Sequence, residues 1–346
     1  MKNRTLNAID IFSGCGGLSE ELRQAGFRVV AGVEADKNAA KAYRLNHKET
    51  VLFEDDIRKL DTGKILKLLN GSPLHLLAGC PPCQGFSSIR KLNRRSAVRD
   101  ERNKLINEYY RFVEELNPLT IMLENVPGIV DYTLFKSIVR KLKKLEYNIV
   151  YKVVDVSNYS VPQRRKRLVM VGSKLCKINI AEGKNSVVTV REALGKLKNV
   201  NQDDDLQKIY PHHSERIQKM IALIPKNGGG RKDLPEEYQL ACHKKENVGF
   251  NDVYGRLRWD TVSSTITGGC LNPSKGRFLH PEEDRCISAR EASLLQTFPI
   301  DYKFPLDIPK VELSLLIGNA LPPAFSKIQA ENIFRHIENC YDRHFQ

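Results

Sequence analysis

The feature of this sequence that most constrains its fold is a regular alternation of short apolar runs with amphipathic stretches over the first half of the chain. The amphipathic stretches repeat apolar residues at helical spacing and predict helices at Leu18–Ala25, Lys37–Leu45, Leu105–Leu116 and Leu134–Leu145. The apolar runs predict strands at Asn7–Phe12, Val29–Glu34, Val51–Phe53, Leu74–Gly79, Thr120–Asn125, Asn148–Val156 and Arg167–Gly172. Strands that alternate with helices predict an α/β fold with a doubly wound, mostly parallel sheet. In such sheets ligands bind at the carboxyl ends of the strands.

The alternation ends near residue 183. Residues 183–285 contain an acidic run at Asp203–Asp205, a glycine cluster at 227–230 and several prolines, which predict a smaller and more irregular domain. A helical pattern returns at Pro323–His336. We therefore expect three parts, namely a ligand-binding domain at 1–182, a small domain at 183–285, and a segment at 286–346 that returns to the first domain.

The composition favours an anionic partner. The 346 residues carry 55 Lys and Arg against 41 Asp and Glu, a formal net charge of +14. Such a balance is typical of proteins that bind nucleic acid or an anionic membrane, although a solvated basic surface is the plainer alternative. No stretch approaches the roughly 18 apolar residues of a membrane span, and the amino terminus lacks the apolar core of a signal peptide. Eight cysteines scattered through a chain of this length indicate a reducing compartment, so we expect a soluble intracellular protein.

A glycine-rich turn follows the first predicted strand. Residues 10–19 read DIFSGCGGLS, and the glycines at 14, 16 and 17 allow a tight turn before a helix. The turn lacks both the GxGxxG pattern and a Walker lysine, so phosphate is not the expected ligand. Glu34 ends the second strand, where an acid accepts hydrogen bonds from ribose hydroxyls, and Asp56 follows the third. The glycine-rich turn and the acids at the strand ends together predict an adenosine ligand, and without a phosphate site this is S-adenosylmethionine rather than NAD. The alternative is a structural role in which Asp36 and Asp55 cap helices.

The stretch GCPPCQGFSS at 79–88 contains two cysteines whose roles must be separated. A metal site needs two more ligands, and the other cysteines form no second CxxC, so we expect no metal. A redox CxxC normally begins a helix, whereas here two prolines fill the gap. The alternative is a nucleophilic thiolate, and Pro81-Pro82 would present Cys83 at the rim of the fourth strand. Cys80 would then be a small packing residue at the strand end.

A carboxylate on the next strand offers a partner for Cys83. Glu124 follows four apolar residues of the fifth predicted strand and should lie at its carboxyl end. A carboxyl group there can hydrogen-bond to a ring nitrogen of a base and make the ring more electrophilic. The alternative is a glutamate that caps the following helix.

Six motifs that occur in order resemble those of the DNA cytosine-5 methyltransferases. The resemblance covers residues 8–182 and 255–325 and is closest to the bacterial restriction–modification type. Its motifs are Phe12-x-Gly14-x-Gly16-Gly17, Pro82-Cys83-Gln84, Glu124-Asn125-Val126, Gln163-Arg164-Arg165-x-Arg167, the run from Arg290 to Pro299, and Ile317-Gly318-Asn319. It implies a Rossmann-like, S-adenosylmethionine-dependent methyltransferase fold with a target-recognition domain at 183–285.

The resemblance also implies a mechanism and a set of site residues. Cys83 would add to C6 of a flipped-out cytosine, Glu124 would hold N3, Arg167 would contact O2, and Arg165 would contact a nearby phosphate. The expected cofactor-binding residues are Phe12, Gly14, Gly16, Gly17, Leu18, Glu34, Asp56, Ile57, Pro82 and Asn319. The chain departs from the family at Ala35, where some members place an aromatic residue that stacks on adenine.

Duplex DNA is the partner that the resemblance implies. Residues 84–104 carry seven basic residues against Asp100 and Glu101, which favours a mobile lid over the DNA backbone rather than a merely solvated loop. The expected DNA contacts are Gln84, Ser87, Arg99, Arg102 and Thr265. The glycine-rich stretch from Asn227 to Lys232 is either a further contact loop or a plain turn.

Other functions remain open from the sequence alone. The first is a tRNA cytosine-5 methyltransferase of related fold, although the Cys-Phe-Thr signature usual in that branch is not found. The others are a catalytically silent DNA-binding module and a zinc or thiol-redox protein built on Cys80 and Cys83. For the leading reading we expect a cytoplasmic, nucleoid-associated monomer that protects host DNA alongside a cognate restriction endonuclease, without a membrane partner.

Overall fold

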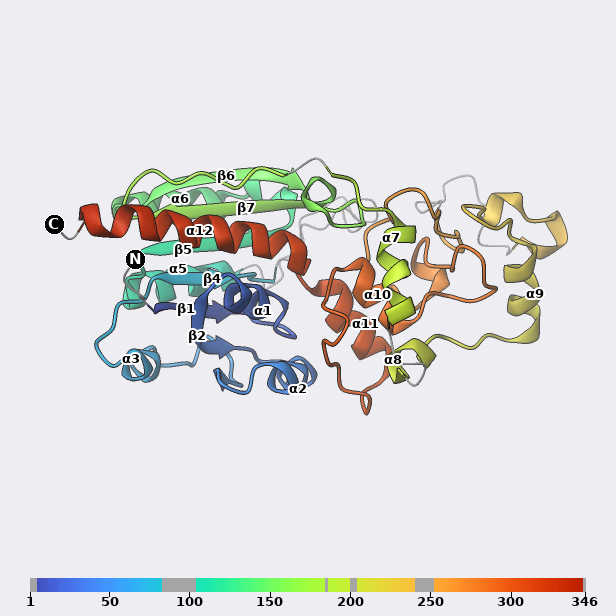
Figure 1. The fold of residues 1–346 in the computed structure, drawn as a ribbon, viewed down its shortest axis with the longest axis horizontal. Helices are drawn as coiled ribbons and strands as arrows, with labels where there is room; N and C mark the ends of the chain where they lie inside the picture. Colours follow the sequence, from blue (N-terminus) through green and yellow to red (C-terminus); the bar gives the residue numbers. More distant parts are fainter. Residues whose placement is uncertain (1–4, 83–103, 184–185, 200–203, 240–251, 345–346) are drawn as a thin grey trace. The chain divides into compact units, whose positions relative to one another are not determined.

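The chain divides into two compact units (Figure 1). The computed structural model describes residues 5–82, 104–183, 186–199, 204–239 and 252–344. Unit 1 comprises Met1–Val156, Lys166–Gly183 and Leu321–Gln346, and unit 2 comprises Ser157–Arg165 and Lys184–Ala320. The domain ranges 1–182, 183–285 and 286–346 stay a prediction, because the units are defined by spatial contacts and group 157–165 and 286–320 with the second unit.

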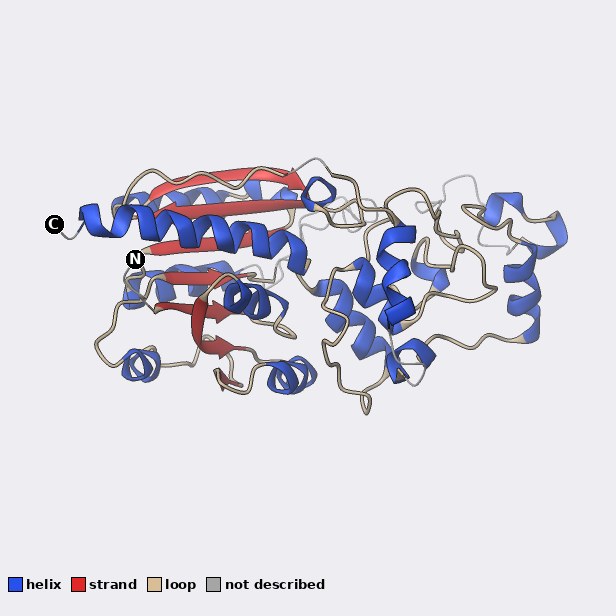
Figure 2. Ribbon diagram, viewed as in Figure 1, coloured by secondary structure: helices blue, strands red, loops and turns tan. Residues whose placement is uncertain are grey.

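Unit 1 is built on a seven-stranded sheet with the order β3-β2-β1-β4-β5-β7-β6 (Figure 2). The strands are β1 Leu6–Ile11, β2 Phe27–Val33, β3 Val51–Phe53, β4 Leu76–Gly79, β5 Thr120–Asn125, β6 Asn148–Asp155 and β7 Lys166–Ser173. All neighbouring pairs are parallel except those that involve β7, which runs antiparallel to both β5 and β6. The predicted mostly parallel α/β sheet is therefore confirmed.

Helices cover both faces of this sheet. They are α1 Gly17–Gln24, α2 Lys37–Asn46, α3 Gly63–Leu69, α5 Ile106–Leu116, α6 Thr133–Lys144 and α12 Pro323–His344. Residues of α3, α5 and α6 share one apolar core with Ile9 and Ile11 of β1. Asp10 lies between those two residues, so its side chain points to the opposite face, where it contacts Ser19 of α1. On that face α12 packs beside α1, with the Phe27 and Phe334 rings 5.2 Å apart (Figure 1).

The sequence explains why these segments are helical. In α6 the buried residues Phe135, Ile138, Val139 and Leu142 follow the spacing of one helix face, and lysines fill the last turn, where they complement the helix dipole. The C-terminal helix extends beyond the predicted stretch, to His344.

Unit 2 consists of short helices joined by irregular segments, as predicted for the smaller domain. Its helices are α7 Val190–Gly195, α8 Asp205–Lys208, α9 Glu215–Leu223, α10 Ala289–Leu295 and α11 Lys310–Asn319. Its described residues form isolated β-bridges rather than strands of their own. A fully buried arginine, Arg256, joins its segments through hydrogen bonds to the carbonyls of Ile221, Ile224, His280 and Glu283 and an ion pair with Asp284. These bonds replace the regular ladders of a sheet.

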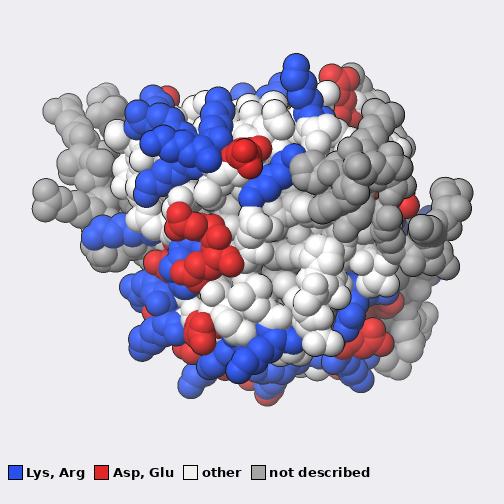
Figure 3. All heavy atoms as spheres, turned by 90° about the vertical axis from the view of Figure 1, so that its left-hand side faces the viewer, with Lys and Arg blue, Asp and Glu red and all other residues white. Residues whose placement is uncertain are grey.

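Basic and acidic side chains share the surface at one end of unit 1. Figure 3 looks onto the end where the parallel strands begin, and there basic side chains are mixed with acidic ones around uncharged surface. A mixed surface of this kind is typical of a solvated face. Among the residues that the structure describes, no helix is both long and apolar enough to span a bilayer.

Candidate active site

The glycine-rich turn lies at the carboxyl end of β1, against the end of β2. Phe12, Gly14 and Gly16 all have positive φ angles, of 58°, 56° and 94°, which for the two glycines explains why no larger residue occurs. A non-glycine residue in this region is strained, and such strain is typical of ligand-binding turns. Ser13 fixes the turn to β2, because its N–H donates to the Val33 carbonyl and its Oγ accepts from the Val33 N–H, each at 3.0 Å.

Glu34 joins this turn to the start of α2. Its Oε2 accepts from the Gly14 N–H at 2.7 Å, and its Oε1 accepts from the Asp36 N–H at 2.8 Å. Burial raises the pKa of Glu34. Each of these oxygens can accept a second hydrogen bond, so the carboxylate has room for ribose hydroxyls, and that contact stays a prediction. Asp36 caps α2 by accepting from the Ala39 N–H at 2.8 Å, so the structural alternative holds for this residue.

The end of β3 contributes Asp56 and Ile57. Arg58 holds the Asp56 carboxylate through Nε at 2.9 Å and Nη2 at 2.5 Å, and these bonds lower the pKa of Asp56. The Asp56 carboxylate, a predicted cofactor contact, therefore already has a basic partner. Ile57 is buried in the core of unit 1.

The remaining predicted cofactor residues fall into three situations. Gly17 and Leu18 open α1, and because the Leu18 side chain is buried, only its backbone N–H remains to meet a ligand. Pro82 is partly buried and follows β4. Asn319 ends α11 in unit 2 and is exposed.

The groups around the glycine-rich turn indicate which cofactor this part of unit 1 can hold. The space beside the Gly14 α-carbon is open, since an added Cβ would meet no atom within 4 Å. Beside it are a carboxylate with spare lone pairs, the first-turn N–H groups of α1 and the partly buried Phe12 ring. This donor set suits an uncharged nucleoside with a ribose diol and provides no lysine or arginine cradle for a diphosphate. The site therefore fits S-adenosylmethionine.

Two charged side chains meet at the carboxyl end of β5. Glu124 is 8% exposed, and its Oε1 lies 2.8 Å from Nε of Arg167 on the adjacent strand β7. Arg167 also donates from Nη1 to the Lys166 carbonyl at 2.8 Å. The sheet register places Glu124 opposite Val169 and Asn125 opposite Leu168, so Arg167 lies just beyond the paired residues. The structure thus brings together two of the predicted catalytic residues.

The segment that leads to Cys83 is tied to the same strand. The Asn125 side chain donates from Nδ2 to the Pro81 carbonyl at 2.9 Å, and both residues are buried. Burial, and then the nearby Glu124 carboxylate, raise the pKa of the Cys80 thiol well above its usual value. A thiol in that state is a poor nucleophile at neutral pH, which agrees with a packing role for Cys80. Predicted residues Cys83, Gln84, Ser87, Arg99 and Arg102 lie outside the described residues.

The structure corrects the role predicted for Arg165. Its side chain is buried in unit 2, where Nη1 donates to the carbonyls of Ile266 at 2.8 Å and Gly318 at 3.0 Å, and Nη2 donates to that of Ala320 at 3.3 Å. A guanidinium enclosed by three carbonyls is not placed to contact a phosphate. Arg165 instead holds segments of unit 2 together. The hydroxyl of Thr265 donates to the Arg164 carbonyl at 2.6 Å, and this residue is partly exposed.

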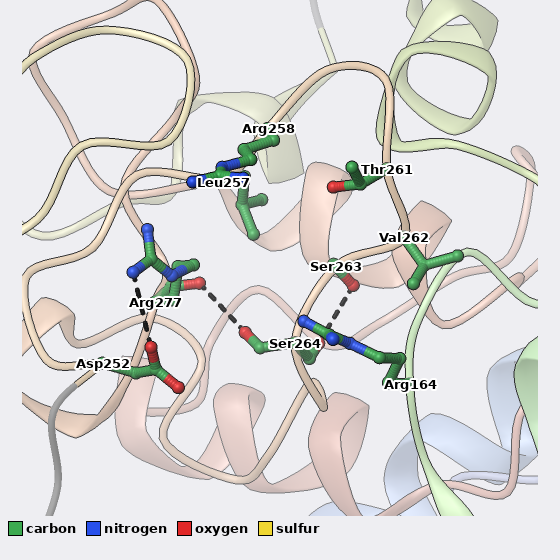
Figure 4. A pocket seen from close by; sticks show the side chains of 9 residues that line it. All are labelled: Arg164, Asp252, Leu257, Arg258, Thr261, Val262, Ser263, Ser264 and Arg277. Carbon is green, nitrogen blue, oxygen red and sulfur yellow. Dashed lines mark hydrogen bonds and ion pairs between the residues drawn. The ribbon is translucent and has the colours of Figure 1, made fainter.

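Unit 2 contains a basic pocket of about 360 Å³ (Figure 4). Its lining includes Arg164, Arg258 and Arg277, with Asp252 and three hydroxyl side chains, Thr261, Ser263 and Ser264. Arg277 is fixed by the carbonyls of Gly228, Gly229 and Arg256 and by a 3.4 Å contact with Asp252. Arg164 and Arg258 are exposed. The glycine-rich stretch therefore supplies backbone carbonyls that hold Arg277 at this pocket. Arg231, in the same predicted contact loop, is buried.

Two features of unit 1 have no counterpart in the sequence analysis. One is the bond from Asn125 to Pro81, which only the pairing of β4 with β5 brings about. The other is a buried chain beneath the glycine-rich turn, in which Ser19 Oγ donates to Asp10 Oδ2 at 2.7 Å and lies 2.8 Å from the Tyr43 hydroxyl. Burial raises the pKa of Asp10 to about 7. The sequence does contain a signal for this buried chain, because Asp10 is an acidic residue within the apolar run of β1.

Comparisons with known proteins agree with this geometry. The family model described as C-5 cytosine-specific DNA methylase matches residues 6–335. Type II methylase M.HgiDII of Herpetosiphon aurantiacus is 35% identical over 349 residues, which cover 97% of each chain. Type II methyltransferase M1.HphI of Haemophilus parahaemolyticus is 29% identical over 339 residues, 96% of this chain and 87% of that one. The crystal structure of an E. coli prophage protein assigned as a DNA modification methyltransferase has a TM-score of 0.72 at 25% identity and covers 98% of this chain and 100% of its own.

Proposed function

Because the chain belongs to the C-5 cytosine-specific DNA methylase family, we propose that Cys83, Glu124 and Arg167 carry out its reaction on a flipped-out cytosine. The protein is a DNA cytosine-5 methyltransferase of the kind found in type II restriction–modification systems, and its methyl donor is S-adenosyl-L-methionine. The residue roles that follow are our assignment. They rest on the contacts around β4, β5 and β7.

The methyl donor is held, in this proposal, by the carboxyl ends of β1 to β3. Glu34 accepts from the ribose hydroxyls, the turn from Phe12 to Gly17 borders the donor, and Asp56, Ile57 and Pro82 complete the set in unit 1. For Asn319, in unit 2, a cofactor contact stays an expectation from the family resemblance. When bound, S-adenosylmethionine supplies an electrophilic methyl group on a sulfonium. The two bonds that Glu34 makes to the backbone orient its carboxylate for this task.

The chain activates the base by covalent addition. C5 of cytosine is a poor nucleophile, so the Cys83 thiolate forms a bond to C6 while N3 takes a proton from the Glu124 carboxyl group. C5 gains electron density from the opened C5–C6 double bond and accepts the methyl group. A base such as water then removes the C5 proton, the Cys83 thiolate leaves C6 as the C5–C6 double bond re-forms, and N3 returns its proton to the Glu124 carboxylate, which leaves 5-methylcytosine. Because C5 and C6 are stacked within a duplex, the base is first flipped out, at a cost of a few kcal/mol.

The observation that carries this proposal is the 2.8 Å contact between Arg167 Nε and Glu124 Oε1. N3 and O2 are adjacent atoms on one edge of cytosine, one suited to a carboxyl donor and the other to a guanidinium donor. A carboxyl and a guanidinium held side by side match that edge. The Asn125 bond to Pro81 ties the residues just before Cys83 to the same strand end.

Contacts to duplex DNA are proposed for the pocket of unit 2. Arg164 and Arg258 are exposed at a site that also offers Thr261, Ser263 and Ser264 as hydrogen-bonding groups. Arginines suit both phosphates and the edge of guanine, and hydroxyls suit phosphates. We also assign DNA contacts to Gln84, Ser87, Arg99, Arg102 and Thr265, as the family resemblance implies.

The cellular setting follows from the relatives. Their names as type II methylases support a cognate restriction endonuclease that recognises the same DNA sequence. We also propose a cytoplasmic enzyme that acts as a monomer. Elution as a single chain on size-exclusion chromatography, with and without DNA, tests the last point.

The proposal is tested with labelled S-adenosylmethionine and either duplex DNA or tRNA. We expect label in duplex DNA alone. Label that appears only in tRNA, or in neither nucleic acid, would contradict the assignment. Cys83→Ser should abolish transfer and also the covalent complex with DNA that contains 5-fluorocytosine, which cannot lose its C5 substituent. Cys80→Ser is the matched control and should keep both. Equal loss from the two variants would show that the roles of the cysteines are assigned wrongly.

A further inference from the structure

Three metal-ligating side chains that play no part in methyl transfer gather at one place in unit 1. Cys176 follows β7, and His336 and Cys340 lie four residues apart on α12. Their ligand atoms lie within 4.8 Å of one another, with His336 Nδ1 3.8 Å from Cys176 Sγ and 4.0 Å from Cys340 Sγ. The structure joins the two sulfurs in a disulfide.

The chemistry of this cluster, rather than its disulfide alone, suggests a ligand. Two thiolates and an imidazole form a soft donor set that Zn²⁺ prefers, and a reducing compartment keeps such thiols free for a metal. Residues four apart on a helix share one face, which places His336 and Cys340 together opposite Cys176.

A neighbouring hydroxyl orients the imidazole. Nε2 of His336 lies 2.8 Å from the Oγ of Ser173, the last residue of β7. Histidines that bind metals almost always use the second ring nitrogen for such a hydrogen bond, which fixes the ring and frees the first nitrogen. Ser173 is fully buried and also accepts from the Leu175 N–H at 3.1 Å, so the hydroxyl is itself held in place.

We propose that the reduced protein binds one Zn²⁺ through Cys176 Sγ, Cys340 Sγ and His336 Nδ1, with water as the fourth ligand. A dithiol reductant opens the Cys176–Cys340 bond, yielding two protein thiols and an oxidised reductant. Zn²⁺ then replaces the two thiol protons, which are released. Metal and disulfide are alternatives, because each uses both sulfurs. This site departs from our expectation of no metal, which rested on the spacing of ligands along the sequence.

The position of the site indicates a structural role. Ser173 pairs with Thr120 at the start of β5, whereas Glu124 near the end of β5 pairs with Val169. The cluster therefore lies at one end of these strands, and the pair Glu124 and Arg167 lies at the other end. Metal binding would fasten α12 to the segment that follows β7, which α12 also contacts through the bond from Asn332 Nδ2 to the Asn179 carbonyl at 2.8 Å.

Cobalt titration tests the site directly. The full-length protein is reduced with a phosphine, freed of metal with a chelator and titrated anaerobically with Co²⁺, whose thiolate charge-transfer absorption reports sulfur ligation. We expect one equivalent to bind, Zn²⁺ to displace it, and Cys176→Ser and Cys340→Ser each to abolish the band. Ser173→Ala keeps all three ligands and should weaken binding about 10- to 100-fold. The control Cys270→Ser, a buried free thiol of unit 2, should bind as wild type does.

A second readout does not depend on the variants' metal spectra. Zn²⁺ should raise the unfolding temperature of the reduced wild type and leave that of Cys176→Ser unchanged, while methyl transfer by both stays the same. The proposal is wrong if reduced wild type gives no cobalt–thiolate band, or if the band survives in both cysteine variants. Equal binding by the oxidised protein would also overturn it.

Discussion

Arg167 on β7 holds Glu124 on β5 through a 2.8 Å contact between its Nε and the glutamate Oε1. Both side chains are largely shielded from water, so this ion pair restricts the orientation of each. A catalytic carboxyl group in a fixed position needs little reorganisation when the base enters. The contact also means that removing one partner leaves the other buried and mispositioned.

Glu124→Gln should therefore lower the rate of methyl transfer strongly while preserving the fold. Glutamine keeps the shape and can still accept from Arg167, but it cannot give a proton to N3. We expect kcat to fall by a factor of about 10² to 10⁴, measured under single-turnover conditions with saturating duplex DNA. The affinity for S-adenosylmethionine, measured by calorimetry, should change little. A loss of cofactor affinity as large as the loss of rate would contradict the assignment of Glu124 to the base.

Asn125→Ala removes the side chain that joins β5 to Pro81. We expect the free energy of unfolding to fall by about 1–2 kcal/mol, because the buried carbonyl of Pro81 loses its donor. We also expect kcat to fall more than KM rises, since the residues before Cys83 are no longer held. Asn148→Ala is the control, because it breaks a partly buried 3.3 Å bond to the Ser173 carbonyl at the opposite end of the strands. Equal effects from the two variants would argue against a positioning role.

Two adjacent arginines should behave differently. Arg165→Met removes the guanidinium that donates to the buried carbonyls of Ile266 and Gly318, and we expect a loss of about 3 kcal/mol or more in the free energy of unfolding. Arg164 is exposed, so Arg164→Met should leave stability within about 0.5 kcal/mol of wild type. Urea denaturation of both variants measures the difference. If Arg165→Met is as stable as wild type, its buried hydrogen bonds are not what holds these segments.

Arg258→Ala should weaken DNA binding in a salt-dependent way. If Arg258 contacts a phosphate, the slope of log K against log salt concentration should decrease in magnitude by about 0.9. Fluorescence anisotropy with cognate and unrelated duplexes over a range of salt concentrations gives this slope. Arg140→Ala, at an exposed position of α6, is the control. An unchanged slope with altered preference between the two duplexes would instead assign Arg258 to base recognition.

The buried Asp10 predicts a pH dependence of stability. Burial raises its pKa in the folded protein to about 7, above the ordinary value of 3.8, so the folded state binds more protons between these values. Stability from this group is complete below about pH 4 and is lost as the pH rises towards 7. Asp10→Asn lacks this loss. Its stability relative to wild type should therefore rise by up to about 1.4 kcal/mol per pH unit across that window.

Chemical denaturation at several pH values measures this effect. Glu21, whose pKa burial also raises to about 7, contributes equally to both proteins and cancels in the comparison. The exposed Asp205→Asn serves as the control. A constant difference between Asp10→Asn and wild type from pH 4 to 7 would show that Asp10 titrates normally in the fold.

The sequence by itself determined the architecture and the family of this protein. Seven apolar runs predicted the seven strands, because strand and helix periodicities are local properties of the chain. The order of motifs from Phe12 to Asn319 indicated the family. Both the strand pattern and the motif order can be read from the sequence alone, since each depends on spacing along the chain.

Only the tertiary structure decided which side chains meet. Arg165 and Arg167 occupy one motif, yet one is buried among carbonyls of unit 2 and the other pairs with Glu124 in unit 1. Cys176 and His336 stand far apart in sequence but come together because β7 ends where α12 passes. Sequence patterns report short-range periodicity, whereas burial and partnership depend on strand order and packing between distant segments. That is why the sequence predicted the residue types of the site but not the contacts that hold them.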